Sequence, residues 1–291
     1  MTKSLGVIGG GVLGRAVSRG FMEHLEVRVH DQVKQRATHA IEECAIADIV
    51  MICLPTPANS DGKCDTGAID RFLHQAYSEE WWRKDSCYVV RSTVPIGYTQ
   101  GQASMYLYGR PLLHSPEFLT ARCALADFQV PARNIIGVPL HYTGIEDRPL
   151  ERLRDLYEKR FPGVLIHEMS SNESELVKLA CNSFFAAKVT LFNLFAEIAA
   201  AHCLSWDSVR AGIMSDGRIA HAHTAVPGPD GKAGWGGACL GKDLADLFHS
   251  ATAAGVDAGL LRDVLERNAR TRAGDDSLAK ISLPAPAKLP E

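Results

Sequence analysis

The chain has 291 residues, of which 46% are hydrophobic and 22% are charged, and this is the composition of a soluble globular protein with about two domains. The formal net charge is −3, and no long basic run interrupts the sequence. These features argue against a nucleic-acid footprint and against a polybasic membrane patch. We expect the partner to be a small molecule.

The eight cysteines form no Cys-x-x-Cys pair and show no zinc-finger spacing, so we expect neither a bound metal nor a disulfide framework. The N-terminus runs directly into an apolar strand without a signal-peptide cleavage site. We expect no apolar stretch to approach the ~20 residues of a membrane span. These observations predict a cytoplasmic protein with reduced thiols and no membrane association.

The first half of the sequence alternates between strand and helix patterns. Residues 4–9 predict a strand, and after a glycine cluster a helical pattern runs from Val12 to about His24. A second strand over 26–30 ends at Asp31, and the apolar runs 47–54 and 86–91 are typical of strands buried on both faces of a parallel sheet. The alternation predicts an α/β fold, with an N-terminal Rossmann-type, doubly wound domain over residues 1–170.

The second half has a different character. Residues 173–202 contain no Pro or Gly and predict one helix longer than is usual in globular proteins. This helix is expected to begin a mainly α-helical domain over residues 171–274, and either to bridge the two domains or to pack against its copy in a homodimer. Residues 275–291, rich in Ala, Pro and Lys, predict a disordered tail.

A glycine-rich segment fits the dinucleotide pattern G-x-G-x-x-G between the first strand and the first helix. Its glycines permit a tight turn, the approach of a pyrophosphate, and close helix–sheet packing, and Asp31 is placed to accept a hydrogen bond from a ribose 2′-hydroxyl. A carboxylate repels a 2′-phosphate, which favours NAD, although Lys34 and Arg36 nearby leave NADP open. The predicted cofactor contacts in this segment are Gly9, Gly11, Val12, Leu13, Gly14 and Asp31.

Three polar residues share one face of the long predicted helix. Glu175, Lys178 and Asn182 are spaced i, i+3 and i+7, which aligns them along a helix. A cation and an amide donor projected into a cleft can stabilise an alcohol oxygen as it becomes an alkoxide. Lys178 and Asn182 are therefore candidates for oxyanion stabilisation.

Cys239 is the candidate nucleophile. It lies between a Gly-Gly pair and Lys242-Asp243, where the glycines permit close approach and Lys242 can favour the thiolate. Attack of the thiolate on an aldehyde gives a thiohemiacetal, a second hydride removal leaves a thioester, and water hydrolyses the thioester. This chemistry predicts a two-step, four-electron oxidation of a primary alcohol to a carboxylate.

Four further segments lie in order along the chain: Pro55-Thr56-Pro57, Ser92-Thr93-Val94-Pro95, Ser115-Pro116-Glu117-Phe118-Leu119, and Gly236-Gly237-Ala238-Cys239-Leu240-Gly241-Lys242-Asp243. Together with the helix residues, they resemble the UDP-glucose/GDP-mannose (nucleotide sugar) 6-dehydrogenase family from Gly6 to about Asn268. The resemblance implies an NAD-dependent dehydrogenase that acts on the CH-OH group of a sugar, nucleotide sugar or nucleoside.

The resemblance also implies roles for individual residues. Thr93 corresponds to the threonine of a conserved motif, Glu117 to a glutamate that assists proton transfer and thioester hydrolysis, and Asp243 to an aspartate that orders water. Arg218 resembles an arginine that reaches the neighbouring subunit's substrate site, which implies a homodimer through helix 173–202. The implied substrate contacts are Phe118, Leu119, Arg218 and Gly236. Further implied cofactor contacts are Pro55, Thr56, Thr93 and Lys242.

The sequence departs from the family pattern in ways that leave the substrate open. Family members are typically longer, so the chain resembles a short form without the C-terminal nucleotide-sugar-binding domain, or one whose site another polypeptide completes. Gly241 stands where proline is usual, and Ser115 where asparagine is frequent. Two other interpretations are a β-hydroxyacid or 6-phosphogluconate-type dehydrogenase performing one oxidation, and a non-catalytic NAD-binding regulator or scaffold.

Overall fold

The structure, a computed structural model, describes residues 2–83, 85–106, 112–140 and 148–274. The chain forms two compact units, one of Met1–Thr56 with Asp65–Lys178 and the other of Pro57–Cys64 with Leu179–Glu291. The predicted disordered tail, 275–291, lies outside the described residues.

The first unit is built on a seven-stranded sheet in the order β2-β1-β3-β4-β5-β6-β7. All neighbouring strands pair in parallel except β5 and β6, which are antiparallel. The strand order reverses between β1 and β3, and the crevice at such a point is where open α/β sheets bind ligands. The predicted α/β, Rossmann-type fold is confirmed. The strands are β1 (Ser4–Ile8), β2 (Glu26–His30), β3 (Ile49–Ile52), β4 (Cys87–Val90), β5 (Leu112–His114), β6 (Asn134–Val138) and β7 (Ile166–Ser170).

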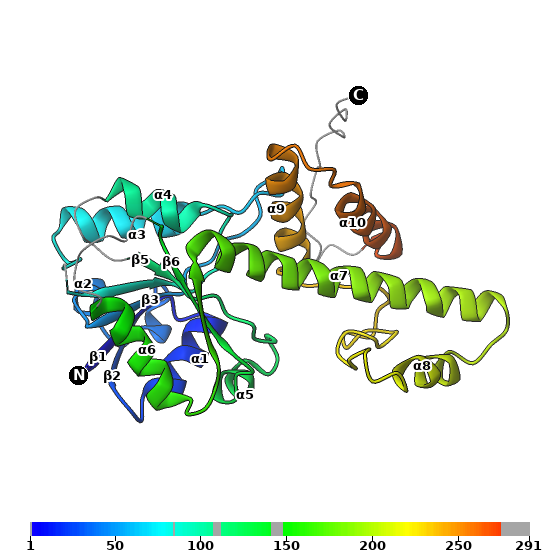
Figure 1. Ribbon diagram of the computed structural model, residues 1–291, viewed down its shortest axis with the longest axis horizontal. Coiled ribbons are helices and arrows are strands. Elements are labelled where there is room, and N and C mark those ends of the chain that lie inside the picture. The colour runs from blue at the N-terminus through cyan, green and yellow to red at the C-terminus, as the bar shows by residue number, and fades with distance from the viewer. Residues whose placement is uncertain (1, 84, 107–111, 141–147, 275–291) are drawn as a thin grey trace. The chain divides into compact units, whose positions relative to one another are not determined.

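Helices cover both faces of this sheet. Figure 1 shows α3 and α4 over one face and α1, α5 and α6 over the other. The first helix begins at Val12 as predicted and ends at Phe21, because the chain then turns into β2. The helices are α1 (Val12–Phe21), α2 (Ile41–Ala45), α3 (Gly67–Ser78), α4 (Tyr98–Met105), α5 (Ala124–Gln129) and α6 (Arg148–Arg160), with a 3-10 turn at Lys34–Arg36.

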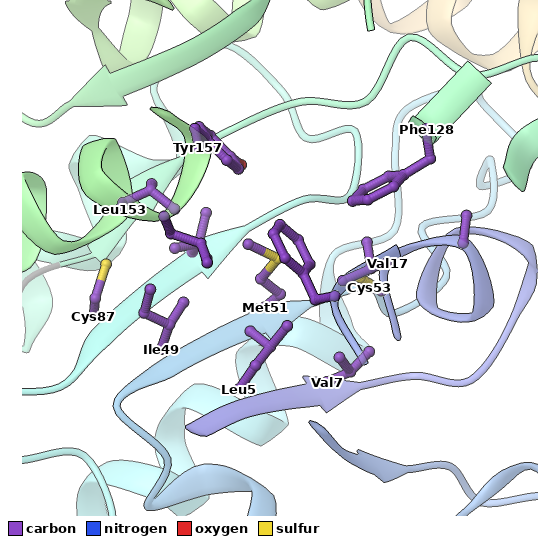
Figure 2. Packing of buried hydrophobic residues seen from close by; sticks show 14 of the residues in the cluster. Leu5, Val7, Val17, Ile49, Met51, Cys53, Cys87, Phe128, Leu153 and Tyr157 are labelled. Atoms are coloured by element: carbon purple, nitrogen blue, oxygen red, sulfur yellow. The ribbon is translucent and has the colours of Figure 1, made fainter. Parts of the chain in front are cut away.

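Alternate strand residues enter two separate hydrophobic cores. Leu5, Met51 and Phe128 belong to the core on the face covered by α1, α5 and α6, part of which Figure 2 shows. On the opposite face, Trp82 stacks on Tyr88 with ring centroids 4.6 Å apart. Because both faces are covered, the strands carry nearly continuous apolar runs, as the sequence indicates.

The second unit is helical and has a smaller core of its own. Its helices are the greater part of α7 (Ser171–Ala201), α8 (Trp206–Met214), α9 (Leu240–Ala253) and α10 (Gly259–Thr271). The first residues of α7, up to Lys178, belong to the first unit. The buried residues of the second core are Ala186, Trp235, Leu244, Ala245, Val264 and Leu265.

Helix α7 is more apolar than the sequence interpretation allowed. By length and composition alone it could cross a membrane, and only 28% of its most apolar stretch of 18 residues is buried. The expectation that no stretch approaches the length of a membrane span is therefore wrong on length and composition. The reason is that the few charged residues of α7 barely lower the mean hydropathy of the helix. A core helix of a soluble protein meets the same criteria.

Candidate functional site

The glycine-rich loop between β1 and α1 has the shape that a dinucleotide requires. Gly9 has a φ of +102°, and a Cβ at Gly14 would lie 1.8 Å from the carbonyl oxygen of Gly9. A Cβ at Gly11 would meet nothing within 4 Å. Gly9 and Gly14 are therefore needed by the turn and by helix packing, whereas Gly11 leaves room for a ligand.

The start of α1 and the end of β2 complete this half of the site. Gly11 is the N-cap of α1 and offers no side chain, so the first amides of the helix can receive a phosphate. Each oxygen of Asp31 accepts one backbone N–H, from Gly10 and Val33, both at 2.7 Å. Each oxygen keeps a second lone pair for a ribose hydroxyl. These residues fit NAD.

Two other predicted contacts in the loop differ in what they present. Val12 has 48% of its surface exposed, whereas Leu13 packs against the core. Leu13 therefore offers a ligand mainly its backbone.

The loop after β3 carries two further predicted cofactor contacts, Pro55 and Thr56. Pro55 is exposed, and the hydroxyl of Thr56 donates to the carbonyl of Thr93 at 2.8 Å. This bond ties the loops that follow β3 and β4 together at the carboxyl edge of the sheet.

A buried ion pair joins the loop after β5 to α7 within the first unit. Lys178 Nζ lies 2.9 Å from Glu117 Oε1, and the two side chains are 4% and 19% exposed. The other carboxylate oxygen accepts the amide of Leu119 at 2.5 Å. Lys178 Nζ also lies 5.6 Å from the centre of the Phe118 ring. The structure thus brings together four of the predicted site residues.

The protonation state of Glu117 follows from these contacts. Burial by itself raises the pKa of this carboxyl group, but the charge and hydrogen bond of Lys178 and the amide of Leu119 outweigh it, so the pKa lies below its ordinary value. Glu117 is therefore an ionised acceptor at neutral pH. Such a group can take a proton from a hydroxyl or from water.

Arg91 is a neighbour of this pair that the sequence interpretation missed. It is buried at the end of β4, and its Nη1 donates to Ser115 Oγ at 2.8 Å and to the Tyr157 hydroxyl at 2.6 Å. Its positive charge also helps to lower the pKa of Glu117. The signal in the sequence was a charged residue at the end of the apolar run 86–91.

A second buried cluster lies within the second unit. Asn182 Nδ2 and Lys242 Nζ each donate to a different oxygen of Asp243, both at 2.5 Å. Asp243 is 1% exposed. Both of its oxygens are thus engaged, and Asp243 aligns Asn182 and Lys242. Burial lowers the pKa of Lys242. Asp243 and then Cys64 and Cys239 raise this pKa by more than burial lowers it, so the ammonium group stays charged at neutral pH.

Cys239 is exposed and is the N-cap residue of α9. The partial positive charge of a helix N-terminus favours an anion at this position. The loop before it is anchored by two amides, because Asn193 accepts the N–H of Gly234 at 2.7 Å and Asn268 accepts that of Trp235 at 2.9 Å. The nucleophile candidate is therefore held by its backbone while its side chain remains accessible.

Gly236 and Arg218, two predicted substrate contacts, have different surroundings. A Cβ at Gly236 would lie 2.8 Å from the guanidinium of Arg272, so the close approach of Arg272 accounts for a glycine here. Arg218 has a side chain that is 89% exposed and lies 2.6 Å from Asp216. Substrate binding by Gly236 and Arg218 stays a prediction.

A short hairpin from the N-terminal half of the sequence joins the second unit, which the sequence interpretation did not foresee. The amide of Cys64 donates to Asp246 Oδ1 at 2.9 Å, and His249 Nε2 lies 2.5 Å from the carbonyl oxygen of Asp61. Lys242 Nζ lies 3.7 Å from Cys64 Sγ. Contacts across such long sequence separations leave no local motif, so no signal could have revealed them.

Comparison with known proteins gives consistent matches along the chain. The model of the UDP-glucose/GDP-mannose dehydrogenase family NAD binding domain matches residues 15–160, and that of the family's central domain matches residues 172–270. UDP-glucose 6-dehydrogenase of Pseudomonas aeruginosa is 33% identical over 245 residues, which cover 79% of this chain and 50% of that protein. The chain therefore spans about half the length of this curated relative.

Two solved structures share the fold. A UDP-glucose dehydrogenase from Pyrobaculum islandicum matches with a TM-score of 0.80 and 24% identity, covering 93% of this chain and 68% of that one. Mycobacterium tuberculosis 3-hydroxyisobutyrate dehydrogenase matches with a TM-score of 0.72 and 21% identity, covering 96% of both chains. At these identities the likeness concerns the fold alone.

The sequence resemblance and the predicted cofactor, NAD, are confirmed by the two domain matches, which follow the predicted order and together cover most of the sequence. The chain belongs to the UDP-glucose/GDP-mannose dehydrogenase family.

Proposed function

We propose that this chain oxidises a primary alcohol of a sugar, nucleotide sugar or nucleoside to the carboxylate in two NAD-dependent steps. The observation that carries the proposal is the set of two buried polar clusters, Lys178–Glu117 and Asn182–Asp243–Lys242, together with an accessible Cys239 at a helix start. Bound NAD supplies a hydride acceptor for each oxidation.

In the first oxidation, Lys178 and Asn182 stabilise the alcohol oxygen. They lie four residues apart on the continuous helix α7, and therefore on one face of it. Their N–H groups donate to the oxygen as negative charge develops there, which is the largest effect available to a site of this kind. The ionised Glu117 accepts the hydroxyl proton, and Thr93 orients the alcohol.

In the second oxidation, Cys239 holds the aldehyde. Its thiolate forms a C–S bond to the carbonyl carbon, the C=O electron pair moves to the oxygen, and Glu117 returns to that oxygen the proton taken in the first oxidation. The resulting thiohemiacetal becomes a thioester when its hydride leaves to a second NAD and its hydroxyl proton passes to Glu117. Glu117 then releases this proton to solvent and accepts another from a water molecule, which attacks the thioester carbonyl. The C–S bond then breaks, which releases the carboxylic acid and restores the thiolate.

The decisive experiment counts reduced cofactor per product with a panel of sugars, nucleotide sugars and nucleosides. Two NADH per carboxylate are expected, and Cys239→Ala should abolish acid formation while Cys123→Ala, at another exposed cysteine, should not. Glu117→Gln should accumulate an acyl group on Cys239, visible by mass spectrometry. One NADH per turnover with an unimpaired Cys239→Ala would favour the single-oxidation alternative. NAD binding with no turnover of any alcohol or aldehyde would favour a regulator or scaffold.

We also propose that the protein is a cytoplasmic homodimer, paired through α7. Phe184, Leu191 and Ile198 recur every seven residues and are 64%, 50% and 47% exposed. A seven-residue apolar stripe is the pattern that pairs helices side by side. In such a dimer, the exposed Arg218 would be free to reach the partner's substrate.

Sedimentation velocity without detergent tests the pairing. The wild type should sediment as a dimer and the double variant Phe184→Glu/Leu191→Glu as a monomer. Leu260→Glu, at a site 74% exposed on α10, is the matched control and should remain dimeric. A monomeric wild type would contradict the proposal, and so would a chain that requires detergent for solubility.

A further inference from the structure

The first two turns of α7 are fastened, within the first unit, to the end of β5 and to the loops that follow β4 and β5. Ser174 Oγ lies 2.6 Å from His114 Nδ1 at the end of β5, and Lys178 pairs with Glu117. Between them, Glu175 accepts the backbone N–H of Gly97 at 2.6 Å and that of Thr99 at 2.8 Å. Glu175 is therefore directed to the start of α4, although the sequence pattern grouped it with Lys178 and Asn182.

Burying the carboxylate of Glu175 costs free energy that a purely structural position would not require. Glu175 is 0% exposed, and its two carboxylate oxygens bond to two separate backbone amides. None of the ion pairs among the described residues includes it. A buried charge without an opposite charge is expensive to desolvate, and here the amides and the N-terminal end of α4 are the compensation. A neutral side chain could fill the same space but has no second acceptor oxygen for the second amide, so the two-point contact of an ionised carboxylate needs an explanation.

The position of the Thr93 loop supplies that explanation. Gly97 follows Thr93 by four residues and has a φ of +90°, so the chain turns sharply there. The loop is held at Thr93 by Thr56 and at Gly97 and Thr99 by Glu175. Glu175 in turn precedes Lys178 by three residues on the same helix face. A single side chain thus links the Thr93 loop to the helix turn that carries Lys178.

We propose that Glu175 is a positioning residue that holds the Thr93 loop in register with Lys178, so that both groups engage one hydroxyl of the substrate. The proposal rests on the proposed function. A displacement of about 1 Å between reacting groups costs about a hundredfold in rate, so a two-point anchor at this place has a large effect on turnover.

The anchor is also sensitive to pH. Burial raises the pKa of Glu175 to about 7, against the backbone hydrogen bonds that lower it. The charged and titratable groups around it are Tyr98 of α4, which donates to Asp70 of α3, then Lys178 on α7, and His114 of β5 through Ser174. Because the pKa is raised, the ionised anchor is lost as pH falls through about 7, and turnover should fall with it.

Two measurements on Glu175→Gln test the proposal, with Glu173→Gln as the matched control. Glu173 is an exposed carboxylate on the first turn of the same helix and bonds to Ser170 instead. The first measurement, amide hydrogen exchange of residues 92–99, needs no turnover. Exchange should be faster in Glu175→Gln at pH 8 and unchanged in Glu173→Gln. Unchanged hydrogen exchange of residues 92–99 in Glu175→Gln would show that Glu175 does not hold the Thr93 loop.

The second measurement is the pH profile of kcat. Glu175→Gln should lose about ten- to a hundredfold in kcat at pH 8 and should lack the decline near pH 7, while KM for NAD changes less than about twofold. Glu175→Asp, which keeps the charge, should recover part of the rate. A pH profile of kcat in Glu175→Gln that matches the wild type would overturn the proposal. A loss of kcat that is fully explained by a smaller fraction of folded protein would overturn it as well. Absence of turnover in the wild type would instead contradict the proposed function.

Discussion

The polar groups of the two units differ in how far they are prepared before a substrate arrives. In the first unit, the Lys178 side chain is 4% exposed and already paired with Glu117. In the second unit, Asn182 is similarly fixed by Asp243, but Cys239 and Arg218 are exposed. In the proposed mechanism, the groups that stabilise developing charge are therefore buried and preorganised, whereas the nucleophile Cys239 and Arg218 stay accessible. Preorganised charges cost no rearrangement at the moment of reaction.

The largest effect should follow from Lys178→Met, which removes the preorganised cation. We expect kcat to fall by about a thousandfold, since one lost oxyanion donor costs about a hundred- to a thousandfold and the substitution also removes a charge. Stability should fall by about 3–5 kcal/mol, because Glu117 is left as a buried, unpaired charge. Steady-state kinetics and urea unfolding measure the two effects.

The double variant Lys178→Met/Glu117→Gln is the control for that prediction. It should regain most of the stability, since no buried charge remains, and none of the activity. If Lys178→Met kept its rate within tenfold, the preorganised pair would have no role in turnover.

A second large contrast concerns two glycines of one loop. Gly14→Ala should lower the melting temperature and abolish NAD binding, because its Cβ would lie 1.8 Å from a backbone oxygen. Gly11→Ala should keep the melting temperature of the wild type, since its Cβ meets nothing within 4 Å, and should weaken NAD binding by occupying the space left for the pyrophosphate. Calorimetry with and without NAD separates the two effects. Equal affinity for NAD in Gly11→Ala and the wild type would disprove this placement of the cofactor.

A smaller effect should appear in the pH dependence of stability. The pKa of Glu117 lies below its ordinary value in the folded chain, so its pair with Lys178 stabilises the fold at pH above the ordinary pKa, and this contribution disappears as pH falls through the folded pKa. Wild type should therefore lose more unfolding free energy on acidification than Glu117→Gln does. Parallel urea titrations from neutral pH downward would reveal it. Identical slopes would mean that Glu117 is not held ionised.

The smallest effect on stability should come from Arg218→Ala. The arginine pairs with Asp216 at the surface, and exposed ion pairs contribute little, so the melting temperature should not change. KM for the substrate should rise several-fold with kcat nearly unchanged. A wild-type KM would leave Arg218 without a part in substrate binding.

The local parts of this molecule could be predicted from sequence, and the long-range parts could not. The glycine loop, its strand and its helix lie within some thirty residues, and the spacing of Lys178 and Asn182 is a property of one helix. By contrast, the contact between Lys242 and Cys64 joins residues 178 positions apart and depends on the whole fold. Glu175 is instructive, because helix periodicity gave its face correctly while its partners on α4 depend on tertiary packing.

The hairpin Pro57–Cys64 has a consequence for any attempt to separate the two units. The chain leaves the first unit after Thr56 and returns to it at Asp65, so no single cut yields two complete pieces. A fragment ending at Lys178 would carry the hairpin without its helix α9, and the complementary fragment would expose Asp246 and His249. Neither fragment is therefore expected to behave as an autonomous protein. Exchanging one half for that of a relative would require transplanting these eight residues as well.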